Sequence, residues 1–110
     1  MPRQGCIPYI QLAILILLEK QGPLCGYGLY KRLRAAGLDV SEAVVYTALS
    51  RMSQRGLVRA VRGEKDGRQV VLYEITEKGV FKLRKLYSVF WELSRAIEAL
   101  AEGPETGAGK

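Results

Sequence analysis

Six apolar residues near the C-terminus recur at the spacing of a helix that packs against another apolar helix. Successive members are three, four, three, four and three positions apart: Leu83, Leu86, Phe90, Leu93, Ile97 and Leu100. Two apolar positions in every seven form a seam along one side of an α-helix, as in a coiled coil. The spacing predicts a helix that Thr76 caps and that continues to about Glu102, with a long apolar partner over its seam.

A second apolar segment, Ile7–Leu18, lies near the N-terminus. It has 12 residues, fewer than the roughly 20 that span a membrane. It also lacks a basic leader and a small-residue cleavage site, so we do not expect a signal peptide. We predict a buried helix from Pro8 to about Lys20 in a soluble, cytoplasmic protein, with proline in the first turn. A helix that is apolar nearly all round needs cover on more than one side.

The C-terminal seam has two interpretations. It could complete the core of a single chain, but residues 8–20 form the only other long apolar helix. In a two-fold dimer, the last helix of one chain would pack on the first and last helices of the other and cover both faces. The sequence therefore favours a homodimer whose interface contains the six seam residues.

Between these helices, turn signals separate shorter elements. We expect a helix over Tyr27–Ala36 that ends at Gly37, and a second helix that Ser41 caps and Gly56 ends. In that second helix Val45, Ala48, Leu49 and Met52 share one apolar face. Strands are expected over residues 57–62 and 68–75, joined by a flexible five-residue tip at residues 63–67.

Positive charge is concentrated in one part of the chain. The net charge is +6, and residues 51–68 contain six basic and two acidic residues, whereas residues 69–110 are balanced. Such a stretch is either a solvated surface or a contact for a polyanion.

Catalytic and metal-binding patterns are missing from the sequence. It contains no histidine, and we find no nucleophile with a partnered base, no phosphate loop, no metal cluster and no requirement for a cofactor. Cys6 and Cys25 lack metal-ligand spacing. The intervening helix would hold them roughly 20 Å apart, too far for an internal disulfide. They are either reduced thiols or, alternatively, form a disulfide between chains.

The order helix, helix, helix, basic hairpin, helix is typical of a winged helix-turn-helix. A helix fits the major groove of DNA, and the hairpin reaches an adjacent groove or phosphate row. We therefore expect a mainly α fold with a two-stranded β-wing. Residues 1–75 would form the DNA-binding domain, residues 76–102 the dimerisation helix, and residues 103–110 a flexible tail.

Several short motifs in order resemble the PadR family of transcriptional regulators over residues 10–100. The family's opening helix and turn are matched by residues 14–18, Gly22-Pro23-Leu24 and residues 26–29. Its recognition helix and first strand are matched by residues 44–49, Arg51-Met52 and residues 55–58. Gly67-Arg68 and 73–79 match the end of the wing and the start of the last helix. The sequence departs from the family at three positions. Cys25 stands where histidine is common, and Thr47 and Gln69 stand where proline is common. These departures affect turn geometry and base preference.

The resemblance implies a homodimeric regulator, most simply a repressor, on an inverted-repeat operator in double-stranded DNA. Tyr46 either donates to a phosphate or is a half-buried packing residue. Arg51 and Arg55 are candidates for contacts with phosphates or bases. In the wing, Lys65 and Arg68 either contact phosphates or belong to a solvated loop. Three residues at the start of the recognition helix are candidates for contacts with base edges: Glu42, Ala43 and Thr47.

The resemblance also suggests a small aromatic effector. Short family members include multidrug sensors that hold planar compounds between tryptophans at the dimer interface, which makes Trp91 and Phe90 candidate contacts. Alternatively, Trp91 packs against the N-terminal helix.

Two other functions remain for the chain as a whole. One is a winged helix used only for protein contacts, which would lack salt-sensitive binding to duplex DNA. The other is an enzyme, which the absence of histidine argues against.

Overall fold

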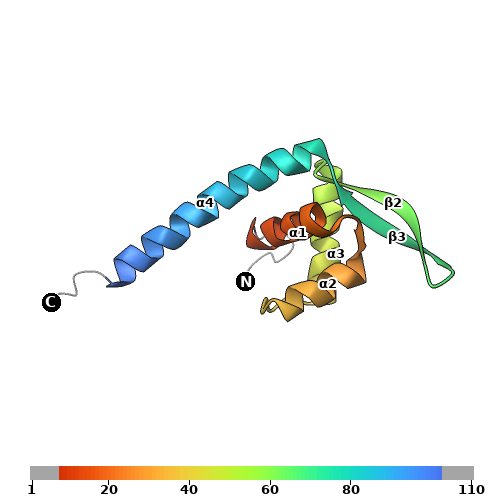
Figure 1. Cartoon of the computed structure of the whole chain (residues 1–110), viewed down its shortest axis with the longest axis horizontal. Coiled ribbons are helices and arrows are strands. Elements are labelled where there is room, and N and C mark those ends of the chain that lie inside the picture. The colour runs from red at the N-terminus through yellow and green to blue at the C-terminus, as the bar shows by residue number, and fades with distance from the viewer. Residues whose placement is uncertain (1–7, 103–110) are drawn as a thin grey trace.

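The computed structural model describes residues 8–102, so Cys6 and the predicted tail at residues 103–110 lie outside the described part. Its mainly helical class confirms the prediction (Figure 1). The elements in chain order are α1 (Pro8–Gln21), β1 (Leu24–Cys25), α2 (Gly26–Ala35), α3 (Glu42–Gln54), β2 (Val58–Lys65), β3 (Arg68–Ile75) and α4 (Glu77–Glu102).

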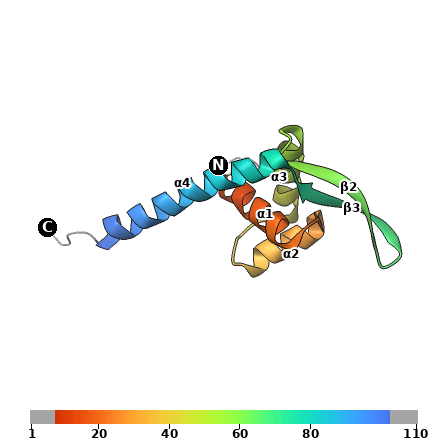
Figure 2. The same ribbon diagram turned by 45° about the horizontal axis from the view of Figure 1, so that its top comes forward.

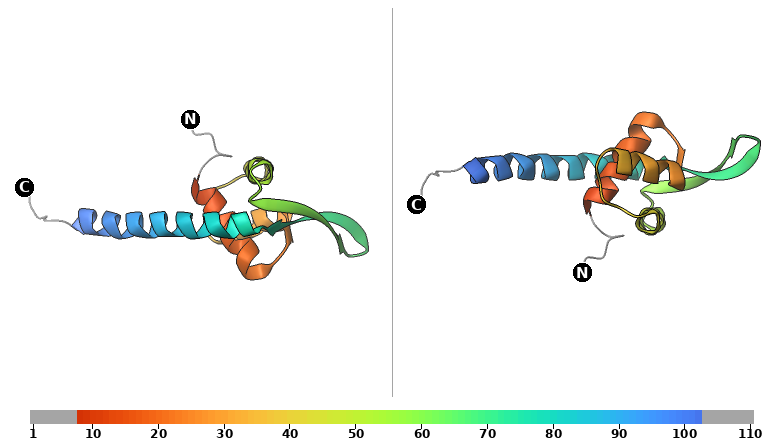
Figure 3. Two further views of the ribbon diagram at one scale, coloured as in Figure 1. Left: turned by 90° about the horizontal axis from the view of Figure 1, so that it is seen from above. Right: turned by 90° about the horizontal axis from the view of Figure 1, so that it is seen from below.

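Helices α1, α2 and α3 form a body from which the β2–β3 hairpin and helix α4 project in opposite directions (Figure 1). The turned view shows the same separation (Figure 2). Seen from above, α3 is viewed end-on while α4 lies across the picture (Figure 3). The axes of α3 and α4 are therefore far from parallel.

The core lies where the helices of the body meet. Its α3 contribution is the predicted stripe of Val45, Ala48, Leu49 and Met52, each fully buried. The remaining buried apolar side chains come from α1, α2, the α2–α3 and α3–β2 connections, the start of β2 and the first turns of α4: Ile10, Ile14, Leu15, Leu18, Leu29, Leu33, Val40, Leu57, Val58 and Leu83.

The predicted helix ends are present. Gly37 has φ +99° and its N–H donates to Arg34 O at 2.9 Å, while Leu38 N–H donates to Leu33 O at 3.1 Å. This pair of bonds is a Schellman motif, which needs a left-handed residue that glycine adopts without strain. Ser41 Oγ accepts the Val44 N–H at 3.1 Å and caps α3.

The sheet has a strand that the sequence did not predict. Its order is β1-β3-β2, with Leu24 opposite Tyr73 and Cys25 opposite Leu72. A strand of two residues is too short to produce an alternating pattern, so only its pairing with β3 defines it. Cys25 Sγ, a free thiol, also caps α2 by accepting the Gly28 N–H at 3.3 Å.

The predicted five-residue flexible tip of the wing is wrong. Strand β2 continues to Lys65, which pairs with Arg68, so the turn contains only Asp66 and Gly67. Both have positive φ, 53° and 78°, as a two-residue type I′ turn requires. The Asp-Gly pair is a strong signal for this turn, and it outweighs the polar, glycine-bounded composition on which the prediction of a loop rested.

The start of α4 is held tightly to the body. Thr76 Oγ1 accepts the Gly79 N–H at 3.0 Å and caps the helix, as predicted. A Cβ on Gly79 would lie 2.1 Å from Leu57 O, so the absence of a side chain allows the close approach. The C-terminal part of the helix projects away from the body (Figure 1). No helix among residues 8–102 is long and apolar enough to cross a membrane.

Candidate nucleic-acid interface

The face of α3 that points away from the core is polar and continuous. Ala43, Thr47, Ser50 and Gln54 are four, three and four positions apart, opposite the buried stripe, and all are exposed. Ala43 and Thr47 were predicted to lie here. Ser50 and Gln54 were missed, although the helical spacing from Ala43 identifies both.

Two larger side chains flank this row. Tyr46 lies along one edge and Arg51 along the other, and with Thr47, Ser50 and Gln54 they line a shallow depression of about 500 Å³. Glu42 is exposed in the first turn of α3. Arg55 is the C-cap of α3 and is also exposed.

Tyr46 is half-buried, with 42% of its surface exposed. Its phenol end lies against Gly26, at the start of α2. Burial is the main cause that raises the pKa of Tyr46 above its ordinary value; the charge of Glu42 adds to it and the Tyr27 backbone partly opposes it. The phenol is therefore a neutral hydrogen-bond donor at physiological pH.

The predicted cations of the wing lie beside its turn. Lys65 and Arg68 are direct partners across the hairpin, so both project from the same side of it. They are exposed, next to the turn at Asp66 and Gly67.

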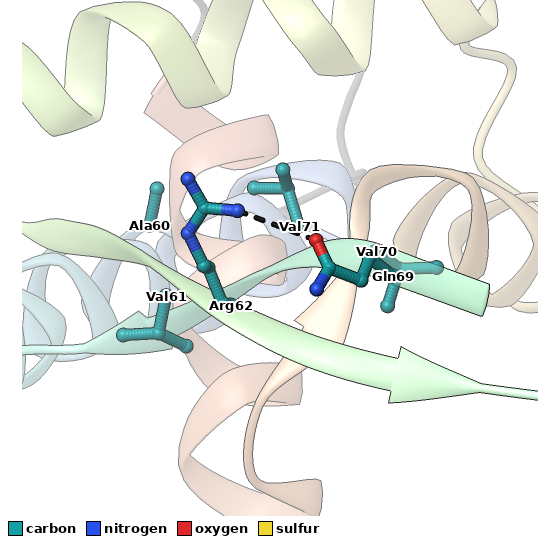
Figure 4. Close-up of a pocket in the computed structure, with 6 residues that line it drawn as sticks. All are labelled: Ala60, Val61, Arg62, Gln69, Val70 and Val71. Carbon is teal, nitrogen blue, oxygen red and sulfur yellow. Dashed lines mark hydrogen bonds between the residues drawn. The ribbon is translucent and has the colours of Figure 1, made fainter. Parts of the chain in front are cut away.

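Arg62, which the sequence analysis did not select, projects from the other side of the hairpin. Figure 4 shows it on the same side as Ala60, Gln69 and Val71, as the register requires. Arg62 Nη1 donates to Gln69 Oε1 at 3.4 Å. These residues, with Val61 and Val70, line a shallow hollow of about 410 Å³. The two-residue alternation of β2 would have separated Arg62 from Lys65.

Most of the positive charge on this surface is uncompensated. Among residues 8–102, ion pairs join Arg34 to Asp39 and Arg59 to Glu74. None of the described pairs involves the exposed cations of α3 and the wing: Arg51, Arg55, Arg62, Lys65 and Arg68. Over the same part of the chain, His, Cys, Asp and Glu residues form no group that could hold a metal ion.

The seam and the candidate effector residues are divided between the body and the projecting part of α4. Leu83 is in the core, and Leu86 packs against it. Phe90 is half-buried, whereas Trp91 is 58% exposed. The exposed fraction then rises toward the end of the helix: 50% for Leu93, 54% for Ile97 and 80% for Leu100.

A helical body whose third helix presents a polar face, followed by a two-stranded wing, defines the winged helix-turn-helix class. The chain belongs to the PadR-like family of transcriptional regulators, whose family model matches residues 14–85. Members of this family are regulators of transcription and not enzymes.

Several solved structures share this fold. The chain has a TM-score of 0.82 and 22% identity to a Streptococcus mutans protein, covering 87% of this chain and 89% of that one. A PadR-like regulator of Bacillus cereus has a TM-score of 0.79 and 26% identity, covering 84% of this chain and 91% of that one. Bacillus subtilis PadR, solved in complex with operator DNA, has a TM-score of 0.62 at 21% identity, covering 70% of this chain and 45% of that one. No curated protein sequence matches the chain.

Proposed function

We propose that this regulator is a cytoplasmic homodimer that binds an inverted-repeat operator in duplex DNA and represses transcription by occupying it. The exposed polar row on α3 carries the proposal. Three of its four members, Thr47, Ser50 and Gln54, have side chains that form hydrogen bonds, which suits them to the base edges of a major groove. Glutamine in particular can make two hydrogen bonds to adenine. The operator complex of Bacillus subtilis PadR supports the same use of the fold here.

In this proposal the flanking groups hold the phosphate backbone. Tyr46 donates its neutral hydroxyl, and Arg51, Arg55, Lys65 and Arg68 provide charge. Arg62 adds a contact from the other side of the wing. Ala43 begins the base-contacting row at the start of α3, and Glu42 lies beside it. Phosphate contacts set affinity and register, whereas base contacts set sequence preference.

The uncovered end of the seam supports the homodimer. Leu93, Ile97 and Leu100 are exposed on a helix whose C-terminal part projects from the body (Figure 1). A second copy of α4 would remove them from water. A two-fold axis would place the two α3 helices in successive major grooves, about 34 Å apart. The operator is therefore an inverted repeat in this proposal.

We also propose a small aromatic effector that contacts Trp91 and Phe90. Its support is the exposed indole of Trp91, which lies beside the part of α4 assigned to the dimer interface. A compound bound there would contact both subunits and so alter the separation of the two α3 helices.

The decisive experiment measures affinity against salt concentration, with a footprint on the upstream region of the gene first supplying the operator. Neutralising roughly 6–10 phosphates predicts a loss of about a thousandfold or more between about 50 and 200 mM salt. Arg68→Ala should weaken binding to operator and random duplexes alike and make the salt dependence shallower, because a phosphate contact carries no sequence information.

Arg95→Ala is the matched control, since Arg95 is an exposed arginine on the projecting part of α4. It should leave both duplex affinities unchanged. Wild-type affinity that ignores salt would instead favour a winged helix used for protein contacts. An Arg68→Ala variant that binds both duplexes like the wild type would refute the phosphate contact from the wing.

A further inference from the structure

Gly26 lies directly under the phenol of Tyr46. A Cβ on Gly26 would lie 2.3 Å from Cε1, 2.6 Å from Cζ and 2.8 Å from Oη of Tyr46. All three atoms belong to the hydroxyl end of the ring. Real Cβ atoms do not approach other heavy atoms this closely, so any side chain larger than hydrogen at Gly26 would displace the phenol.

The backbone gives no other reason for glycine at this position. The glycines with positive φ are Gly22, Gly37, Gly56 and Gly67, whereas Gly26 is the first residue of α2 and does not share that conformation. The contact with Tyr46 therefore explains the residue.

Gly28 shows the contrast within the same helix. A Cβ there would lie 3.3 Å from Arg32 Nη1 and 3.4 Å from Cys25 Sγ, and the arginine end is flexible. Gly28→Ala is thus a matched control: the same substitution in the same helix, without a collision with Tyr46.

We propose that Gly26 is a positioning residue of the DNA interface, because its missing side chain lets the Tyr46 phenol lie against the start of α2 and sets where its hydroxyl meets a phosphate. The inference rests on the proposed function. Tyr46 also lines the α3 depression together with Thr47 and Ser50. A displaced ring would move its donor away from the backbone while the base-contacting row stays in place.

The test compares Gly26→Ala, Gly28→Ala, Tyr46→Ala and the Gly26→Ala/Tyr46→Ala double variant. We expect Gly26→Ala to bind operator and random duplexes about a hundredfold more weakly, since the dimer loses two hydrogen bonds to charged acceptors, each worth about tenfold. The salt slope should not change, because the phenol is neutral. Gly28→Ala should bind like the wild type. The double variant should bind no more weakly than Tyr46→Ala, since the ring through which Gly26 acts is then absent.

Thermal unfolding decides the case in which Gly26→Ala folds poorly. Without the Tyr46 ring the added methyl meets no obstacle, so the double variant should melt at or above Tyr46→Ala. A salt-dependent wild type whose Gly26→Ala variant binds equally well would overturn this inference alone. The inference would also be overturned if Gly26→Ala lowered the affinity or the melting temperature as much in the Tyr46→Ala background as in the wild type. A wild type that ignores duplex DNA would overturn the proposed function as well.

Discussion

Arg59 Nε donates a 2.8 Å hydrogen bond to Glu74 Oε2 across strands β2 and β3. The two residues are direct partners in the register and form an ion pair at the base of the wing. Arg62, on the other side of β2, has the neutral amide of Gln69 as its partner. Two arginines three residues apart therefore differ in how much charge they can offer to DNA.

This difference predicts different salt dependences for Arg62→Ala and Arg59→Ala. Arg62→Ala should make the salt slope shallower by about two per dimer, since each lost phosphate contact is worth about 0.9. Arg59→Ala removes the same formal charge but no phosphate contact, so its slope should stay close to that of the wild type. Affinity titrations at several salt concentrations check this. Equal slopes for the two variants would contradict the assignment.

The proposed dimer predicts a large effect of Leu93→Asp. The substitution places an unpaired carboxylate in the apolar interface and should raise the dimer dissociation constant by more than about a hundredfold. Ser88→Asp, on the opposite side of the same helix, is the control and should not change assembly. Sedimentation equilibrium measures both variants. The dimer model fails if the wild type sediments as a stable monomer at micromolar concentration, or if Leu93→Asp assembles like the wild type.

The tight turn of the wing predicts that Gly67→Val weakens DNA binding by about thirtyfold or more, because a left-handed conformation costs a residue with a Cβ about 1–2 kcal/mol in each of the dimer's two wings. Without DNA the turn is free to relax into another conformation, because residues 64–68 are all exposed, so the melting temperature should change little. Gly67→Asn is the control, because asparagine tolerates positive φ and leaves the charge of the wing unchanged. Duplex titrations and thermal unfolding test both variants. An unchanged affinity for Gly67→Val would show that the turn geometry does not matter for binding.

Substitution of Gly79 should instead lower the stability of the fold. An added Cβ would collide with the Leu57 carbonyl and the Ile75 side chain, and backbone cannot move aside as a flexible side chain does. Gly79→Ala should lower the free energy of unfolding by about 1–3 kcal/mol, the usual cost of overpacking. Urea denaturation measures it, with Gly28→Ala as the control. Equal stability of the two variants would mean that α4 can shift at no cost.

The proposed effector site predicts that planar cationic or aromatic compounds quench Trp91 fluorescence and weaken DNA binding together. Coupling between two sites is reciprocal, so bound operator should weaken the binding of the compound by the same factor. Titrations of compound with and without operator measure the coupling. Quenching without a change in DNA affinity would indicate binding that is not linked to regulation.

Helical periodicity and glycine stops determined much of this protein from the sequence alone. The stripe from Val45 to Met52, the caps at Ser41 and Thr76, and the stop at Gly37 depend on neighbours within a few residues. Such local rules were sufficient to predict the mainly helical class with a hairpin before the last helix. They also placed Tyr46, Thr47 and Arg51 on one helix.

Tertiary structure decided the features that depend on distant partners. Strand β1 exists only because Leu24 and Cys25 pair with β3, and Gly26 is tied to Tyr46 only because α2 and α3 pack together. The seam of α4 is uniform in sequence, yet Leu83 is 4% exposed and Leu100 is 80% exposed. Spacing defines a helical face, but only the position of the body relative to α4 determines which part of that face is covered.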